Sequence, residues 1–187
     1  MNNLLPIFRI NMKQFVFLMG MPGCGKSTIG KKLAKKIKFQ FIDLDDYIEK
    51  KEKKSISSIF NDKGESTFRN LETHYLKEII SASQQTIVSL GGGTPCFNNN
   101  LEFINEKGIS IYFEAPLKLL RDRILAAKHI RPMFKDLNEK EVLGKLKDLI
   151  EKRKLFYELA TYKINVLELN IELIINQIIS NYTSVEN

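Results

Sequence analysis

One stretch near the N-terminus has the residue types and the spacing of a phosphate-binding loop. Residues 20–27 read Gly-Met-Pro-Gly-Cys-Gly-Lys-Ser, which matches the pattern G-x-x-x-x-G-K-[ST]. The glycines let the backbone curl so that several N–H groups face one phosphate, and a helix that starts near Lys26 adds the positive end of its dipole. Lys26 places a charge beside the β- and γ-phosphates, and the Ser27 hydroxyl is an oxygen ligand of the kind that Mg²⁺ prefers.

The sequence therefore predicts that this loop binds the phosphates of a nucleotide. Cys24 lies inside the loop, where only its backbone N–H is needed, and we expect a passive small residue rather than a redox switch. The alternative is a glycine turn that merely joins a strand to a helix. The predicted nucleotide-binding residues in the loop are Gly23, Cys24, Gly25, Lys26, Ser27 and Thr28.

Apolar runs and amphipathic segments alternate along the whole chain, and this alternation predicts the α/β class with a parallel sheet covered on both faces. Ile29, Leu33 and Ile37 are spaced four apart, which places them on one face of a helix that follows the loop. Strands are predicted at residues 14–19, 39–44, 86–90, 109–113 and 162–166. Helices are predicted at residues 26–37, 64–82, 117–125, 138–160 and 171–182.

Polar and glycine-rich clusters come where three of the predicted strands end. The phosphate loop follows the first strand, Asp43 and Asp45 end the second, and residues 91–93 (Gly-Gly-Gly) follow the third. Ligands of parallel sheets bind at the carboxyl ends of the strands. The three segments are therefore expected to meet at one site.

Further charged residues stand in short patterns along the chain. For these residues, and for the clusters just described, the alternative is an ordinary structural role without ligand binding. Asp45 would then cap a helix that begins near Asp46, and residues 91–93 would form an ordinary turn. The arginines would be exposed residues of helices or of a loop. The patterns are Gly64-Glu65 with Phe68-Arg69 and Glu72, then Arg131-Pro132, then Arg153 with Tyr157.

Taken together, these motifs resemble those of shikimate kinases in order and separation, from about Gln14 to Val166. The matching patterns are D-x-D at 43–45, G-E-x-x-F-R-x-x-E at 64–72, the glycine triplet at 91–93, R-P at 131–132 and R-x-x-x-Y at 153–157. The resemblance implies a three-layer domain of the nucleoside monophosphate kinase type, with a five-stranded parallel sheet in the order 2-3-1-4-5. It also implies a mobile lid at about residues 124–137.

The reaction that the resemblance implies is transfer of phosphate from ATP to the 3-hydroxyl of shikimate, with Mg²⁺, on the route to chorismate and the aromatic amino acids. Shikimate carries one carboxylate and three hydroxyls. Arg69 and Arg153 would supply guanidinium forks for the carboxylate, which pair with it better than lysine does. Glu72 lies three residues after Arg69 on the same helix face, so it would hold that arginine and accept from a substrate hydroxyl.

The remaining roles concern the reacting groups. Lys26 and Asp45 are predicted to be catalytic, with Asp45 positioning or deprotonating the attacking hydroxyl. Ser27 and Asp43 would bind Mg²⁺, the carboxylate through water. The backbone of Gly91, Gly92 and Gly93 would lie against the substrate ring, because no side chain intervenes.

Two more arginines complete the predicted nucleotide site. Arg131 would move in with the lid and neutralise charge that develops on the γ-phosphate, so it counts as both catalytic and nucleotide-binding. Arg123 is predicted to contact the nucleotide, stacking on adenine.

Composition limits the choice of partners. The chain has 187 residues and a net charge of +7. Its lysines are scattered and form no long block interleaved with aromatics, which favours a solvated surface over nucleic acid binding. Cys24 and Cys96 are far apart and match neither a disulfide framework nor a zinc pattern. No apolar run is long enough to span a membrane.

From these features we expect a monomeric cytoplasmic protein whose partners are ATP and a small molecule. Residues 1–12 would form a disordered lead, and residues 13–187 a single kinase domain. Two other functions stay open at this point. One is another small-molecule kinase of the same fold, acting on gluconate or a nucleotide. The other is a non-catalytic nucleotide-binding protein, associated with regulation or with RNA.

Overall fold

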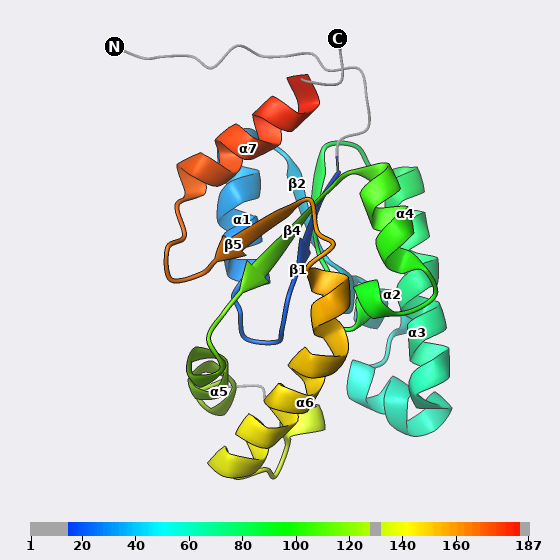
Figure 1. The fold of residues 1–187 in the computed structure, drawn as a ribbon. Coiled ribbons are helices and arrows are strands. Elements are labelled where there is room, and N and C mark those ends of the chain that lie inside the picture. Colours follow the sequence, from blue (N-terminus) through cyan, green and yellow to red (C-terminus); the bar gives the residue numbers. More distant parts are fainter. Residues whose placement is uncertain (1–14, 128–131, 184–187) are drawn as a thin grey trace.

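The computed structural model describes residues 15–127 and 132–183. Within these residues the sheet has five parallel strands in the order β2-β3-β1-β4-β5, which confirms the predicted order (Figure 1). The strands are β1 Phe15–Met19, β2 Gln40–Asp43, β3 Thr86–Ser89, β4 Ile109–Glu114 and β5 Tyr162–Asn165.

The central strands are apolar because helices cover both of their faces. Every residue of β1 is buried, as is every residue of β3, whereas the edge strands β2 and β5 are partly exposed. Strands buried on both faces read as continuous apolar runs rather than as an alternation. This is why β1 could be recognised from its sequence alone.

Helices lie on both sides of the sheet and give the molecule three layers. In Figure 1, α1 and α7 cover one face, and α3 and α4 cover the other. The α-helices are α1 Lys26–Ile37, α2 Leu44–Glu52, α3 Ile56–Ala82, α4 Asn100–Lys107, α5 Leu117–Leu125, α6 Glu139–Tyr157 and α7 Ile171–Thr183. Two short 3₁₀ helices are η1 Thr94–Cys96 and η2 Pro132–Phe134.

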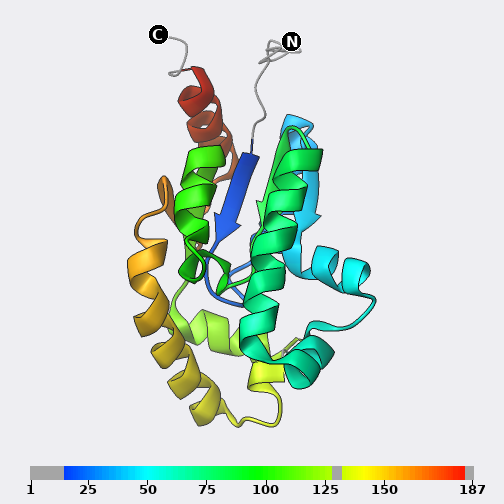
Figure 2. The same cartoon turned by 90° about the vertical axis from the view of Figure 1, so that its right-hand side faces the viewer.

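Three helices differ from the sequence prediction. Helix α2 was expected only in the alternative that places a helix near Asp46. The long helix α3 begins at Ile56 instead of residue 64, and it is broken at Gly64, which has φ 76° and ψ 173° (Figure 2). The prediction found only the part after this break, because the part before it, residues 56–63, is too short to show a period of its own. It missed α4, since an eight-residue helix with two buried apolar residues, Leu101 and Ile104, is too short to show a period.

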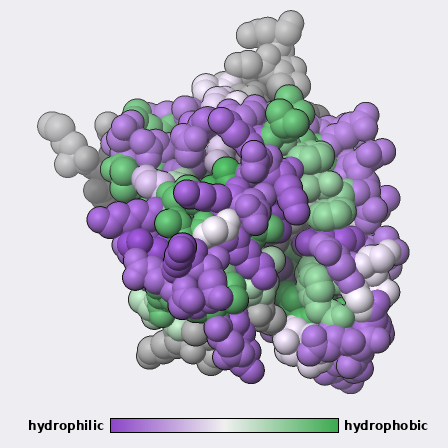
Figure 3. Space-filling view, turned by 60° about the horizontal axis from the view of Figure 1, so that its bottom comes forward, coloured by the Kyte–Doolittle hydropathy of each residue, from purple (hydrophilic) through white to green (hydrophobic). Residues whose placement is uncertain are grey.

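The carboxyl ends of the strands meet at the lower edge of the sheet in Figure 1. Here the phosphate loop follows β1, α2 follows β2, and the glycine triplet follows β3. Figure 3 looks onto this end, where a hollow lies between two largely hydrophilic parts of the surface.

Some predicted features concern residues that the structure does not describe. The predicted lead at residues 1–12 lies outside the described residues, and so do residues 128–131 of the predicted lid, including Arg131. Among the helices that the structure describes, none is both long and apolar enough to cross a membrane.

Candidate active site

The phosphate loop joins β1 to α1 in a conformation that requires glycine. Gly20 and Gly25 have φ of 138° and 103°, in the region that side chains disfavour. A Cβ on Gly20 would also lie 2.7 Å from the backbone oxygen of Phe113 on β4. The loop therefore packs tightly against the end of the sheet, and its position is fixed before any ligand binds.

Lys26 begins α1, and its side chain lies across the loop. The ammonium donates to the backbone oxygens of Gly20, at 2.9 Å, and Met21, at 3.2 Å, and the residue is only 5% exposed. The two carbonyl oxygens hold the Lys26 side chain against the loop. A bound phosphate would replace these backbone oxygens as the acceptor of the Lys26 ammonium.

Ser27 and Asp43 lie in direct contact, although 16 residues separate them. The Ser27 hydroxyl donates to Oδ2 of Asp43 at 2.5 Å, and it lies 3.3 Å from the hydroxyl of Ser89 at the end of β3. Three oxygen-bearing side chains from α1, β2 and β3 therefore meet. Sequence reasoning missed Ser89, a neutral residue two positions before the glycine triplet.

Asp43 also caps α2. Its Oδ1 accepts from the backbone N–H of Asp45 at 3.1 Å, and α2 begins at Leu44. The alternative in which Asp45 caps a helix near Asp46 is therefore wrong. The cap turns the chain so that Asp45, in the first turn of α2, faces the phosphate loop across a cavity of about 240 Å³. The cavity is lined by Gly23, Gly25, Lys26, Ser27, Thr28, Asp43, Asp45, Ser89 and Leu90.

The donor set at this cavity fits a magnesium ion bound together with a nucleotide. Ser27 and Asp43 offer hard oxygen ligands. Mg²⁺ usually keeps several waters and uses one or two carboxylates plus phosphate oxygens, so it needs no complete protein cage. The structure brings together the two residues that the sequence assigned to the metal.

Arg69 lies on α3 just after the Gly64 break and is 8% exposed. Its Nη1 donates to Glu72 Oε2 at 2.6 Å, and its Nε and Nη2 donate to Glu65 Oε1 at 3.2 and 2.8 Å. Glu72 therefore holds Arg69 from within the protein, while the more exposed Glu65 holds it from the solvent side.

Glu72 is 1% exposed and also accepts from the hydroxyl of Thr94 in η1. Burial raises the pKa of Glu72, while the charge of Arg69 and the bonds from Thr94 and Arg69 oppose that rise. A Cβ on Gly91 would lie 2.6 Å from Glu72 Oε1 and 3.0 Å from Asp45 Oδ1. The first glycine of the triplet thus leaves room for carboxylates from α2 and α3.

Arg153 is a second buried arginine, on α6. It is 7% exposed, yet none of the ion pairs among the described residues involves it. Its Nη1 lies 4.0 Å from Sδ of Met21 in the phosphate loop, and 3.0 Å from where a Cβ on Gly92 would stand. A Cβ on Gly93 would in turn lie 2.6 Å from Nη1 of Arg69. The two guanidinium groups therefore lie against neighbouring glycines.

Tyr157 fixes this part of the site, a role that the sequence did not indicate. Its hydroxyl donates to the backbone oxygen of Gly92 at 2.5 Å, and its ring stacks on Tyr112 with centroids 4.9 Å apart. The side chain is completely buried, which raises its pKa. Arg153 and Tyr157 are one helical turn apart, so one face of α6 supplies both the cation and the anchor.

Arg123 lies on α5 beside the phosphate loop. Its Nη1 donates to the backbone oxygen of Gly23 at 3.0 Å. The structure therefore places Arg123 against the phosphate loop, and its contact with adenine stays a prediction.

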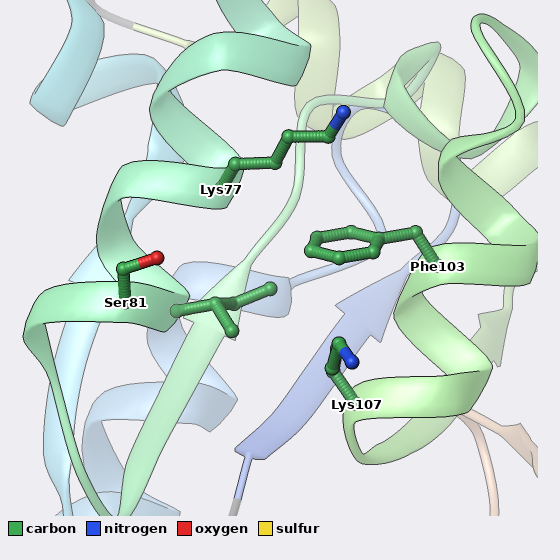
Figure 4. A pocket seen from close by; sticks show the side chains of 5 residues that line it. Lys77, Ser81, Phe103 and Lys107 are labelled. Atoms are coloured by element: carbon green, nitrogen blue, oxygen red, sulfur yellow. The ribbon is translucent and has the colours of Figure 1, made fainter.

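A second cavity, of about 420 Å³, lies away from these residues, between α3 and α4 (Figure 4). Lys77, Ile80, Ser81, Phe103 and Lys107 line it, and none of the predicted site residues is among them. The predicted residues that the structure describes gather instead at the carboxyl ends of the strands.

Comparison with known proteins decides which kinases the chain is related to. The family model described as shikimate kinase matches residues 22–183, which include the phosphate loop from Pro22 onward, Arg69, Arg153 and the glycine triplet. This chain belongs to the shikimate kinase family.

Related shikimate kinases match most of the chain. The shikimate kinase of Azobacteroides pseudotrichonymphae is 39% identical over 166 residues, covering 89% of this chain and 95% of the relative. That of Parabacteroides distasonis is 40% identical over 146 residues, covering 78% and 84%.

Solved structures agree with this assignment. Shikimate kinase from Bacteroides thetaiotaomicron has a TM-score of 0.80 and 35% identity, covering 92% of this chain and 96% of its own. Shikimate kinase from Acinetobacter baumannii, in complex with shikimate, has a TM-score of 0.79 and 33% identity, covering 90% and 94%. A gluconokinase from Sinorhizobium meliloti has a TM-score of 0.56 and 14% identity, which shows a shared fold alone.

Proposed function

We propose that this chain transfers the γ-phosphoryl group of ATP to the 3-hydroxyl of shikimate, giving 3-phosphoshikimate and ADP. The observation that carries the proposal is Arg153, a buried guanidinium that forms no ion pair among the described residues and lies against the phosphate loop. A buried charge without a partner is costly, so such a group is suited to an anionic ligand. Membership of the shikimate kinase family supports a carboxylate as that anion.

Arg69 and Arg153 bind the acceptor carboxylate together. They differ in how they are already neutralised, because Arg69 has two carboxylate partners, Glu65 and Glu72, whereas Arg153 has none among the described residues. Arg153 therefore contributes most of the electrostatic attraction to the acceptor carboxylate. Arg69 orients the carboxylate through hydrogen bonds from its remaining N–H groups. The glycine triplet between them lets the ring of the acceptor approach the backbone.

Asp45 faces the attacking hydroxyl. It lines the same cavity as Lys26 and Ser27, and its carboxylate lies beside Gly91. An acceptor whose carboxylate rests on the arginines would thus place a hydroxyl between Asp45 and the nucleotide. Asp45 then aligns that hydroxyl or takes its proton as the phosphoryl group is transferred.

On the nucleotide side, the loop N–H groups and Lys26 bind the phosphates, and Ser27 and Asp43 hold Mg²⁺. The ion, when bound, neutralises charge on the β- and γ-phosphates. The contact between Ser27 and Asp43 and the oxygen-rich lining of the cavity support this choice of metal ligands. Arg123 contacts the nucleotide beside Gly23. Arg131, which lies outside the described residues, is the cation proposed for the γ-phosphate.

We further propose a cytoplasmic monomer that acts without nucleic acid, with residues 13–187 forming one kinase domain. Size-exclusion chromatography with light scattering tests the oligomeric state.

A coupled assay of ADP release with a panel of acceptors tests the reaction. We expect release that depends on Mg²⁺ and on shikimate, and no release with gluconate or with a nucleoside monophosphate. The Lys26→Ala variant, purified in parallel, controls for contaminating kinases.

Other outcomes would replace the proposal. Release only with gluconate or with a nucleotide would make the chain another kinase of this fold. No turnover with any acceptor, together with salt-sensitive retention of RNA, would favour a nucleotide-binding protein without kinase activity.

A further inference from the structure

Phe97 is a large apolar residue at the surface, and its ring covers a buried cation. It directly follows η1 and is 38% exposed, whereas Arg69 is 8% exposed. The centre of the phenyl ring lies 4.3 Å from Cζ of Arg69. A guanidinium over an aromatic face at this distance is attracted by the ring and loses water on that side.

The other sides of the same guanidinium are also occupied. A Cβ on Gly93 would lie between 2.6 and 2.8 Å from Nη1, Cζ and Nη2 of Arg69, so the backbone of Gly93 rests against its flat face. Glu65 accepts from Nε and Nη2, and Glu72 accepts from Nη1. A guanidinium has five N–H groups, which leaves two for a ligand.

The position of the ring relative to Arg69 is itself fixed. The side-chain amide of Asn98 donates to the backbone oxygen of Arg69 at 3.2 Å and to the hydroxyl of Thr73 at 3.0 Å. Immediately before Phe97 the chain forms η1, whose first residue, Thr94, donates to Glu72. The segment that carries the ring is thus bound on both sides to α3, the helix that carries Arg69.

We propose that Phe97 is a positioning residue for the acceptor: its ring fixes the plane of the Arg69 guanidinium, so that the two remaining N–H groups point at the acceptor carboxylate. The inference rests on the proposed function. Fixing the plane matters because charge-assisted pairing with a carboxylate depends on the alignment of both N–H groups. Without the Phe97 ring, Arg69 keeps its charge, its two glutamates and the more distant Phe68 ring, 5.4 Å from its Cζ, but loses the closer ring that restrains its plane.

Steady-state kinetics of Phe97 variants test this role. Phe97→Ala should raise KM for shikimate roughly 3- to 30-fold, the range expected when a cation–π contact of this kind is lost, and leave KM for ATP unchanged. Phe97→Tyr, which keeps an aromatic face, should restore the wild-type value. Phe97→Leu, which keeps apolar bulk only, should remain impaired.

Phe103→Ala is the matched control. Its ring also faces lysine ammonium groups, Lys77 at 5.7 Å and Lys107 at 5.8 Å, but in the second cavity between α3 and α4 (Figure 4). This variant loses the same ring from a partly exposed site and should leave both KM values unchanged.

A double-mutant cycle shows whether the ring acts through Arg69. Phe97→Ala should have no further effect on shikimate affinity, measured by calorimetry, in an Arg69→Ala background, and its full effect in an Arg153→Ala background. Equal effects in both backgrounds would overturn the proposal, and so would a Leu variant as active as the Tyr variant. If the wild-type enzyme turns over shikimate and Phe97→Ala leaves KM unchanged, this inference fails while the proposed function stands.

Discussion

The phosphate loop and the acceptor pocket lie side by side, but they are built differently. Residues 20–27 form the loop as one continuous segment, and its contacts to Lys26 come from the backbone of that same segment. The acceptor pocket takes Arg69 from α3, Gly91–Gly93 from the end of β3, and Arg153 from α6. Besides the pairs within α3, its contacts join distant segments, such as Thr94 with Glu72 and Tyr157 with the backbone of Gly92.

This difference has a consequence for substitutions in each region. Backbone N–H groups survive the replacement of a side chain, so only a few loop side chains are indispensable, above all Lys26. In the pocket each arginine depends on other side chains, such as Glu72 for Arg69 and the Tyr157–Gly92 contact beside Arg153. Changes in the loop should therefore affect the phosphoryl transfer itself, while changes in the pocket should affect affinity for the acceptor.

The largest effect is expected for Lys26→Ala. Because this ammonium is the charge next to the transferred phosphate, its loss should lower kcat by about 10³-fold or more, as measured by shikimate-dependent ADP release. Lys32→Ala, an exposed lysine on the same helix, is the control and should retain activity. Near-normal turnover of Lys26→Ala, with an unchanged melting temperature, would remove the lysine from the mechanism.

Asp45→Asn comes next. It keeps the size of the side chain but removes the negative charge that aligns or deprotonates the hydroxyl, so kcat should fall by roughly 10²-fold. The neighbouring Asp46→Asn, on the exposed side of α2, serves as the control. A loss of less than threefold would mean that Asp45 has no part in the chemistry.

Arg153→Ala should act on the acceptor alone. Losing a charge-assisted pair of about 1.5–3 kcal/mol corresponds to a roughly 10- to 100-fold higher KM for shikimate, with KM for ATP little changed. Arg153→Lys should recover only part of this, because an ammonium cannot form the planar fork. Lys152→Ala, on the exposed face of α6, is the control. An equal rise in both KM values would place Arg153 outside the acceptor pocket.

The smallest expected effect concerns the two cysteines, of which Cys24 lies in the phosphate loop and Cys96 beside the acceptor pocket. Cys24 in the phosphate loop is 0% exposed. Cys96 in η1 is partly exposed, and the charges of Arg69 and Arg153 both act on its thiol. Burial raises the pKa of Cys96 to about 11, although both arginines favour its thiolate. A raised pKa keeps the thiol protonated at neutral pH, so little of the reactive thiolate forms there.

Alkylation of Cys96 by iodoacetamide, followed by peptide mass spectrometry, should therefore be slow at pH 7. Its rate should rise about tenfold per pH unit without a plateau below pH 10, and saturating shikimate should reduce it severalfold. Cys24 should stay unlabelled. A plateau near pH 8, or labelling of Cys24 at the rate of Cys96, would contradict this picture of the two regions.

The sequence predicted most of the fold because its main elements carry local signals. The all-apolar β1, the four-residue spacing in α1 and the bounds of α5 agree with the structure, and the strand order is confirmed. The errors have local causes as well. Gly64 interrupts α3 and hid its first part, and α4 is too short to show a period.

For the site, the sequence named the charged residues, including Glu72 as the partner of Arg69, but not the neutral residues that hold them. Tyr157 was noticed only as part of a pattern, while Ser89, Thr94 and Phe97 were not singled out. Neutral side chains at ordinary positions give no signal of their own, because their roles depend on partners from other elements.

The sequence by itself determined the phosphate loop, since a contiguous run of glycines, a lysine and a serine defines both the backbone shape and the charge. It also determined the parallel α/β class through alternating apolar and amphipathic segments. Only the tertiary structure decided that Asp43 rather than Asp45 caps α2, and that Arg153 is buried with no acidic partner among the described residues. The reason is physical: a local motif is fixed by neighbours along the chain, whereas pairing, burial and orientation depend on which distant side chains the fold brings within a few ångströms.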